Sequence, residues 1–163
     1  MNCQKCQGRC CRHERIIVTQ EEHRMLDLPL KVRLFDMGSW DERWEDNLVV
    51  INGKKFELVV EKTKQNECPM LGANGCKAVV KPIICQIFPF WYLKDEGLIF
   101  DRDMDFVCPM TLSMTYQEIL LTINETEKSI KDKVELFYQH HETKQEVQWR
   151  REKVMELMPN FGS

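Results

Sequence analysis

The sequence predicts an α+β fold in which a small β-hairpin-rich unit is stapled by cysteines and long C-terminal helices pack on it. Two observations lead to this fold class. All eight cysteines lie within residues 1–108, among short β-rich runs separated by turn residues. Residues 111–158 contain no cysteine, glycine or proline and carry apolar residues at helical spacing. The 163 residues fit a single domain, 1–163, with a cysteine-cluster module at 1–110 and a helical extension at 111–160.

The first regular elements are predicted just after a cysteine-rich head. The apolar run "RIIVT", residues 15–19, predicts a short strand because it is rich in β-branched residues. Thr19 followed by Glu22 has the spacing of a capping box, which predicts a helix that begins near Gln20 and covers "EEHRMLDL". Pro29 then predicts the end of this helix.

Two β-hairpins are predicted in the middle of the chain. In "LVVINGKKFELVV", residues 48–60, two β-rich runs flank Asn52-Gly53, and this dipeptide is the strongest short signal for a hairpin turn. In "WYLKDEGLIFD", residues 91–101, a second hairpin is expected around the turn residues that end at Gly97.

The C-terminal third predicts two helices. Thr115 and Glu118 have the spacing of another capping box. An amphipathic helix is predicted from apolar residues at helical spacing, namely Ile119, Ile123, Ile130, Val134, Phe137 and Tyr138. A second helix is predicted over "KQEVQWRREKVMELM", residues 144–158, and His140 and His141 are expected at the surface or in helix packing.

Composition narrows the class of protein. An apolar fraction of 43% and a charged fraction of 30% are typical of globular proteins. A net charge of −3 argues against general binding to nucleic acid, which favours a basic surface. No apolar run approaches the ~20 residues of a membrane span, so no membrane association is expected. The start "MNCQKC" lacks the pattern of a secretory signal, which predicts a cytoplasmic protein.

The cysteines are the candidate functional residues. Four thiols within "NCQKCQGRCC" could be disulfide partners, metal ligands or redox nucleophiles. Disulfides are rare in a reducing cytoplasm, where dense cysteines more often bind metal or act in catalysis. We therefore predict that the cysteines bind metal, in two sets of four: Cys3, Cys6, Cys10 and Cys11, and then Cys68, Cys76, Cys85 and Cys108. The side chains of the neighbours Cys10 and Cys11 diverge, so this pair either serves two centres or includes one cysteine that is packed or free.

Both zinc and an iron–sulfur cluster of the 4Fe-4S type agree with these thiolate ligands. The second set lacks the short-spaced pairs that are common in structural zinc sites. Cys68 and Cys108 are each followed by Pro-Met, and Cys-Pro also ends the ligand run of bacterial ferredoxins. This favours iron–sulfur without excluding zinc. The four cysteines of the second set are expected to share one centre, and the apolar run "IFPFWY" is expected in the core or around that centre.

The joint pattern of Cys-x2-Cys-x3-Cys-Cys, "CPMLGANGC", "KPIICQIFPF" and a late Cys-Pro resembles a family of cysteine-cluster proteins described as zinc- or iron-chelating domains. Flagellin lysine N-methylase is similar in carrying this module. The resemblance implies a metal or iron–sulfur centre on all eight cysteines and leaves a methyltransferase open. Family members usually carry arginines where this chain has Lys81 and Gln86.

Three functions follow as hypotheses. The leading one is a metal-binding cysteine-cluster protein that acts in electron transfer, maturation or protein modification through a protein partner or protein substrate. The second, implied by the resemblance, is an enzyme that uses S-adenosylmethionine to methylate protein lysines. The third is a structural zinc module that presents its helices to another protein.

Overall fold

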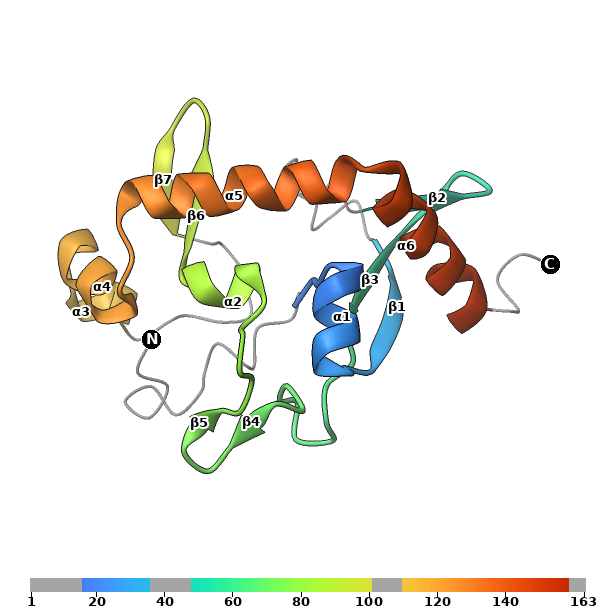
Figure 1. The fold of residues 1–163 in the computed structure, drawn as a ribbon, viewed down its shortest axis with the longest axis horizontal. Coiled ribbons are helices and arrows are strands. Elements are labelled where there is room, and N and C mark those ends of the chain that lie inside the picture. Colours follow the sequence, from blue (N-terminus) through green and yellow to red (C-terminus); the bar gives the residue numbers. More distant parts are fainter. Residues whose placement is uncertain (1–15, 36–47, 101–109, 159–163) are drawn as a thin grey trace. The chain divides into compact units, whose positions relative to one another are not determined.

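The computed structural model describes residues 16–35, 48–100 and 110–158 and confirms the α+β fold. Within these ranges the chain forms six helices and seven strands, and every strand pairing is antiparallel (Figure 1). The chain divides into two compact units, each made of two stretches of sequence. Unit 1 comprises residues 1–16 and 62–137, and unit 2 comprises residues 17–61 and 138–163. The predicted single domain stays a prediction, because compact units need not fold independently.

Unit 2 is built on a three-stranded sheet with the order β1-β3-β2. The strands are β1 (Leu30–Leu34), β2 (Leu48–Ile51) and β3 (Lys54–Val60). The predicted hairpin at Asn52-Gly53 is confirmed, because Ile51 pairs with Lys54 across this two-residue turn. Asn52 and Gly53 have φ angles of 51° and 78°, the left-handed values that a tight hairpin turn requires.

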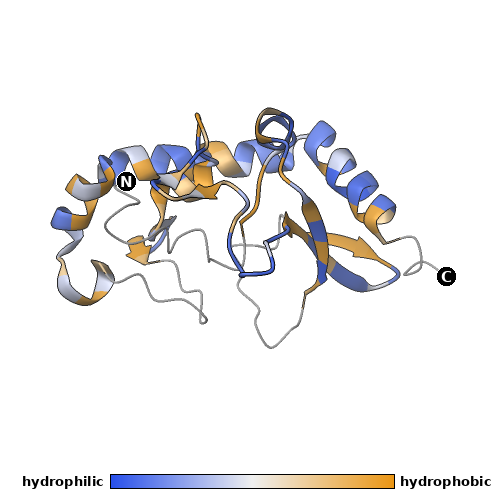
Figure 2. Cartoon of the chain, turned by 90° about the horizontal axis from the view of Figure 1, so that it is seen from below, coloured by the Kyte–Doolittle hydropathy of each residue, from blue (hydrophilic) through white to orange (hydrophobic). Residues whose placement is uncertain are grey.

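The helix predicted over residues 144–158 is confirmed as α6 (Lys144–Leu157), and it covers one face of this sheet. Phe56 and Leu58 of β3 lie in one buried cluster with Trp149 and Val154 of α6, and Val49 of β2 completes it. Most residues of α6 are hydrophilic, and hydrophobic residues occur at intervals along it, as its colouring shows (Figure 2). The burial of apolar side chains between α6 and the sheet contributes most of the free energy that holds the helix there.

Helix α1 (Gln20–Leu26) begins with the predicted capping box. The Thr19 hydroxyl accepts a hydrogen bond from the Glu22 amide at 3.1 Å, and the Glu22 carboxylate accepts one from the Thr19 amide at 2.9 Å. The helix ends at Asp27, whose left-handed backbone (φ 48°) stops it two residues before Pro29. The predicted strand over residues 15–19 is wrong for the described positions 16–19, which are buried but form no strand. Burial alone accounts for their apolar composition.

Unit 1 contains two more hairpins and a short helix. The first hairpin joins β4 (Leu71–Gly72) to β5 (Gly75–Cys76), and α2 (Ile83–Ile87) follows. The second hairpin joins β6 (Phe90–Leu93) to β7 (Gly97–Phe100), which confirms the prediction around Gly97. Trp91 of β6 is fully buried and meets Phe137 edge-on, with ring centroids 5.5 Å apart.

The C-terminal part of unit 1 differs from the sequence prediction at one point. The single amphipathic helix predicted through Ile119 and Tyr138 is two helices, α4 (Tyr116–Ile123) and α5 (Glu127–Glu142), after the short α3 (Met110–Ser113). Asn124 ends α4 in a left-handed conformation with φ 58°. Thr126 and Ser129 then exchange side-chain to backbone hydrogen bonds that start α5. The two helices bury all of the predicted apolar residues except Tyr138, which is half-buried.

Candidate metal centre

The β4–β5 hairpin carries two of the predicted ligands, Cys68 and Cys76. Cys68 begins a four-residue turn in which its carbonyl accepts a hydrogen bond from the Leu71 amide at 3.0 Å. Leu71 in turn lies opposite Cys76 in the strand pairing. The Lys77 amide extends the ladder by donating to the Met70 carbonyl at 2.8 Å. These contacts fold the "CPMLGANGC" segment back on itself.

This backbone geometry limits the separation of the two cysteines. The ends of a hydrogen-bonded four-residue turn lie within about 7 Å between Cα atoms. Opposed residues of antiparallel strands lie about 5 Å apart. The Cα atoms of Cys68 and Cys76 are therefore within about 12 Å of each other by these limits. This limit applies to the backbone alone and sets no distance between the two sulfurs.

Gly75 allows the backbone to turn between β4 and β5. Its φ of 104° lies in a region that residues with a side chain rarely adopt, and it directly precedes Cys76. Cys68 is buried, and Cys76 is half-buried. Thiolate sulfur is a donor suited to zinc and to iron–sulfur clusters.

Cys85 lies in the first turn of α2. The amides of Cys85 and Gln86 both donate to the Pro82 carbonyl, at 2.9 and 3.0 Å. Ile84 and Ile87 are 5% and 0% exposed and attach the helix to the core of unit 1. Cys85 is half-buried. The apolar residues therefore fix the short helix on which this cysteine lies.

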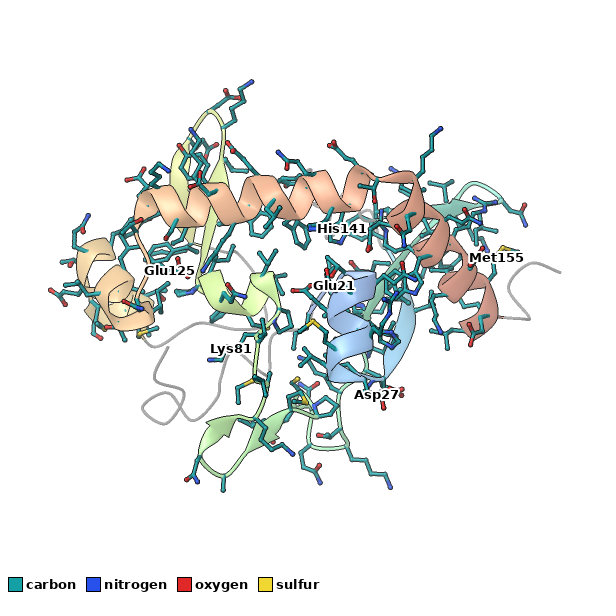
Figure 3. All side chains as sticks on the ribbon, viewed as in Figure 1. Glu21, Asp27, Lys81, Glu125, His141 and Met155 are labelled. Carbon is teal, nitrogen blue, oxygen red and sulfur yellow. The ribbon has the colours of Figure 1, made fainter. Side chains whose placement is uncertain are left out.

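Gln86 makes a further contact within this segment. Its side-chain Nε2 donates a hydrogen bond to the Lys81 carbonyl at 2.6 Å. Lys81 lies in the stretch that leads into α2 (Figure 3). Pro82, at the N-cap of α2, makes no side-chain capping bond. The neutral side-chain amide of Gln86 therefore links residues 81 and 86. In the cysteine-cluster family that the sequence resembles, this position usually carries a charge.

The aromatic run after Cys85 belongs to the core, as predicted for "IFPFWY". Phe88, Phe90 and Trp91 are all buried. The Phe88–Pro89 peptide bond is cis. Phe90 stacks on Phe100 with centroids 5.4 Å apart. The second part of that prediction, a wall around a metal centre, stays a prediction.

Five of the predicted ligands lie outside the described residues, namely Cys3, Cys6, Cys10, Cys11 and Cys108. Among residues 16–35, 48–100 and 110–158, no group of three or more histidine, cysteine, aspartate or glutamate side chains is arranged to hold a metal ion. The grouping of Cys68, Cys76 and Cys85 with Cys108 on one centre therefore stays a prediction. So does the metal site formed by the N-terminal four.

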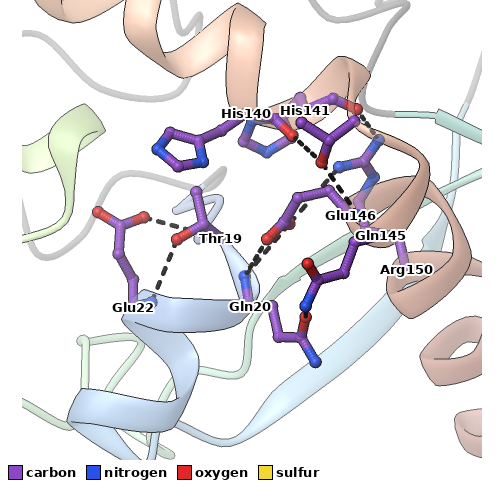
Figure 4. A network of polar contacts seen from close by, with 9 residues as sticks. Thr19, Gln20, Glu22, His140, His141, Gln145, Glu146 and Arg150 are labelled. Atoms are coloured by element: carbon purple, nitrogen blue, oxygen red, sulfur yellow. Dashed lines mark hydrogen bonds and ion pairs between the residues drawn. The ribbon is translucent and has the colours of Figure 1, made fainter.

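Unit 2 contains a buried polar network that the sequence did not predict (Figure 4). Both carboxylate oxygens of Glu146 accept a hydrogen bond from the Gln20 amide, at 3.1 and 3.2 Å. Arg150 lies 3.9 Å from Glu146 and donates to the His141 carbonyl at 2.8 Å. His141 is fully buried, so helix packing rather than surface exposure describes it. The network joins the start of α1 to the first turn of α6.

Burial controls the ionisation of Glu146. Desolvation raises the pKa of this carboxyl above the ordinary value of 4.5. The hydrogen bond from Gln20 and the charges of Arg150 and His140 lower the pKa, and the charge of Glu22 raises it. Thr143 caps α6 by accepting from the Glu146 amide at 3.3 Å. Only the Thr143–Glu146 spacing signals this arrangement in the sequence, since Gln20 and Glu146 are 126 positions apart.

Comparison of the chain with family models, with curated proteins and with solved structures found no match. The resemblance to the zinc- or iron-chelating cysteine-cluster family therefore stays a prediction from the sequence. No helix in the described part of the chain is long and apolar enough to cross a membrane.

Proposed function

We propose that this chain is a metal-binding protein whose cysteine thiolates hold an iron–sulfur cluster, with zinc as the alternative ion. The observation that carries the proposal is the β4–β5 hairpin, whose turn and strand pairing connect the buried Cys68 to the half-buried Cys76 through Leu71. A third thiol, Cys85, follows on an anchored helical turn. Thiolates are ligands that soft and borderline metals favour.

The proposed setting follows from the chemistry of the thiols. Thiolates that bind metal persist in a reducing compartment, so the proposal places the protein in the cytoplasm. A cluster held in a partly buried site supports electron transfer or the maturation of a protein partner. A protein partner or substrate is part of the proposal, and neither nucleic acid nor a membrane is.

Anaerobic purification followed by iron, zinc and sulfide analysis tests the proposal. Bound iron with matching acid-labile sulfide, and a brown colour, is the expected result. Zinc in a colourless protein would support the alternative ion. A native mass without metal, together with a denatured mass lowered by the hydrogens that four disulfides remove, would show that the eight cysteines are paired instead.

Variants of the hairpin connect that result to the described residues. Cys68→Ser and Cys76→Ser should each lose bound metal, because a hydroxyl is a poor replacement for a thiolate toward these ions. Lys77→Ala is the matched control, since Lys77 is exposed on the same hairpin and contributes its backbone amide to the ladder. Unchanged metal content in both serine variants would remove the hairpin from the site.

The two other hypotheses are tested with the same preparation. A structural zinc module would bind zinc, lack redox activity and unfold when a chelator removes the ion. A methyltransferase would retain S-adenosylmethionine, and isothermal titration with this compound provides the measurement. The methyltransferase rests on the resemblance alone, so it ranks behind the metal-binding function.

A further inference from the structure

We infer that the outer edge of β1 binds an extended segment of a protein partner, which joins the sheet of unit 2 as a fourth strand. The bound segment alternates apolar residues with acidic residues. Three features of unit 2 lead to this surface: unpaired backbone groups along the edge, a pocket at its start and the charge of Lys31. Unit 2 contains no cysteine, so strand binding does not depend on the proposed metal.

The outer edge of β1, drawn in light blue in Figure 1, exposes the backbone of every second residue. Phe35 lies directly after β1, and its amide donates to the Lys55 carbonyl at 2.8 Å. Hydrogen-bonded and non-hydrogen-bonded residues alternate along an antiparallel pair, so the backbone groups of Leu30, Val32 and Leu34 face away from β3. These three residues make no backbone hydrogen bond within the part of the chain that the structure describes. Such an edge is a template for a further strand.

The other edge of the sheet, at β2, differs from that of β1. Arg151 of α6 donates from Nη1 to the Val50 carbonyl at 3.5 Å, so α6 reaches this edge. Strand addition is therefore expected at β1 and not at β2.

A pocket of about 330 Å³ lies at the start of the β1 edge, between the ends of α1 and α6. Its lining includes four apolar residues and two opposite charges, namely Leu28, Pro29, Leu30, Leu157, Asp27 and Lys153. The volume is at the low end for ligand pockets, and the charges balance, so one apolar side chain suits it. Directly opposed residues of a sheet share a face, so a partner residue opposite Leu30 lies on the face that carries this pocket.

Lys31 gives the partner segment its preferred charge. Its side chain is exposed and makes no ion pair or hydrogen bond among residues 16–35, 48–100 and 110–158. Arg33 shares the face of Lys31, because side chains alternate along a strand, and lies 3.4 Å from the buried Glu57 carboxylate. Lys31 therefore carries the unbalanced charge, and a carboxylate directly opposite it on the added strand is favourable.

The same charges disfavour a second copy of this chain as the partner. Two β1 strands can pair antiparallel only if outward-facing residues oppose each other. Registers centred on Lys31, Val32 or Arg33 then place a cation directly opposite a cation. Like charges in that position are destabilising, so an acidic strand from a different protein fits the edge better.

The test uses the full-length protein and two short fluorescein-labelled peptides. One peptide alternates leucine with glutamate, and the other alternates leucine with lysine. Fluorescence anisotropy should show that the acidic peptide binds about threefold or more tightly than the basic one. Its binding should slow hydrogen exchange at the Val32 and Leu34 amides, which exchange fast in the free protein. Exchange at the Val50 amide of β2 should not change.

Variants of the edge separate strand pairing from general attraction. Leu34→Pro removes an outward-facing N–H at an exposed residue, a position where an edge strand tolerates proline. It should bind the acidic peptide roughly three- to tenfold more weakly. Val50→Pro is the matched control, because it removes an outward-facing N–H from β2, and its affinity should equal that of the wild-type protein.

Charge variants test the preferred partner. Lys31→Glu should reverse the preference between the two peptides, whereas Lys54→Glu, at the exposed start of β3, should not. Lys31→Glu changes an exposed side chain, so it decides the test if Leu34→Pro fails to fold. Its melting temperature should stay close to that of the wild-type protein.

Several results would overturn this assignment. Slow exchange of the Val32 and Leu34 amides in the free protein would show that the edge is already paired. Failure of the acidic peptide to bind, or equal binding of both peptides, would remove the proposed partner. Sedimentation as a dimer that Leu34→Pro dissociates would identify a second copy instead. Iron, zinc and sulfide content tests the proposed function separately, because these variants leave every cysteine in place.

Discussion

Removal of the Glu146 carboxylate should loosen the attachment of α1 to α6 within unit 2. In Glu146→Ala, the Gln20 amide loses an acceptor that it contacts at 3.1 and 3.2 Å. Hydrogen bonds to charged groups contribute about 1.5–3 kcal/mol. Because this bond is partly buried, we expect the free energy of unfolding to fall by about 2 kcal/mol. Hydrogen exchange at the Gln20 amide should become faster in the same variant.

The sign of the pH dependence follows from the raised pKa of Glu146. Attraction to Arg150 at 3.9 Å amounts to about 4 kcal/mol at an effective dielectric constant of ~20. The loss of hydration of a buried carboxylate costs several kcal/mol in the opposite direction. Desolvation is the largest influence and raises the pKa above 4.5. The folded protein therefore holds a proton on Glu146 at a pH where the unfolded chain has released it.

The contribution of this group to stability is consequently greatest below pH 4.5 and is lost as the pH rises through the raised pKa. Relative to Glu146→Gln, the wild-type protein should gain stability as the pH falls from 7 to 4.5. Urea unfolding followed by circular dichroism at several pH values measures this difference. If the wild-type protein instead gains stability relative to Glu146→Gln as the pH rises, the attraction to Arg150 outweighs desolvation and the reasoning is refuted.

Glu156→Ala is the control for the Ala variant. Glu156 lies on the same helix, and its side chain is 64% exposed in an ion pair with Lys153. Exposed ion pairs contribute about 0–1 kcal/mol, so this variant should change the unfolding free energy by less than about 1 kcal/mol. Equal losses in the two variants would mean that the Gln20 contact has no special role.

Three further predictions concern stability. Gly53→Ala should lower the free energy of unfolding by about 1 kcal/mol, measured by thermal unfolding, because the φ angle of Gly53 is 78° and no atom lies within 4 Å of an added Cβ. No change would show that the turn shifts to relieve the strain. Trp91→Ala should cost about 3–5 kcal/mol in urea unfolding because it empties a fully buried site, whereas Leu121→Ala, at an 81% exposed position, should cost little. Thr19→Ala should cost about 1 kcal/mol through loss of the capping bond to Glu22, measured by thermal unfolding, and Thr19→Ser should restore it.

Local signals predicted much of the fold. The hairpin at Asn52-Gly53 and the start of α1 at Thr19 both depend on residues that lie close together in the sequence, so the pattern contains the whole cause. The break at Asn124 was missed because the apolar spacing continues across it. Thr126 and Ser129 carried the signal for a new helix start, and the capping bonds between them show its physical cause.

Contacts between distant residues were not predictable in this way. The bond between Gln20 and Glu146 leaves no trace in either local sequence, and neither does the full burial of His141. For the candidate site, the sequence predicted which residues are involved, and the structure adds the hairpin that relates Cys68 to Cys76.

The layout of unit 2 has a consequence for protein synthesis. Its sheet is complete at residue 60, but α6, which covers Phe56 and Leu58, comes from the far end of the chain. The 83 residues between Val60, the end of β3, and Lys144, the start of α6, take roughly 4–17 s to translate at the usual rates. During that interval the nascent sheet exposes apolar side chains that the finished protein buries. A ribosome-associated chaperone would have its main opportunity to bind this chain before α6 emerges.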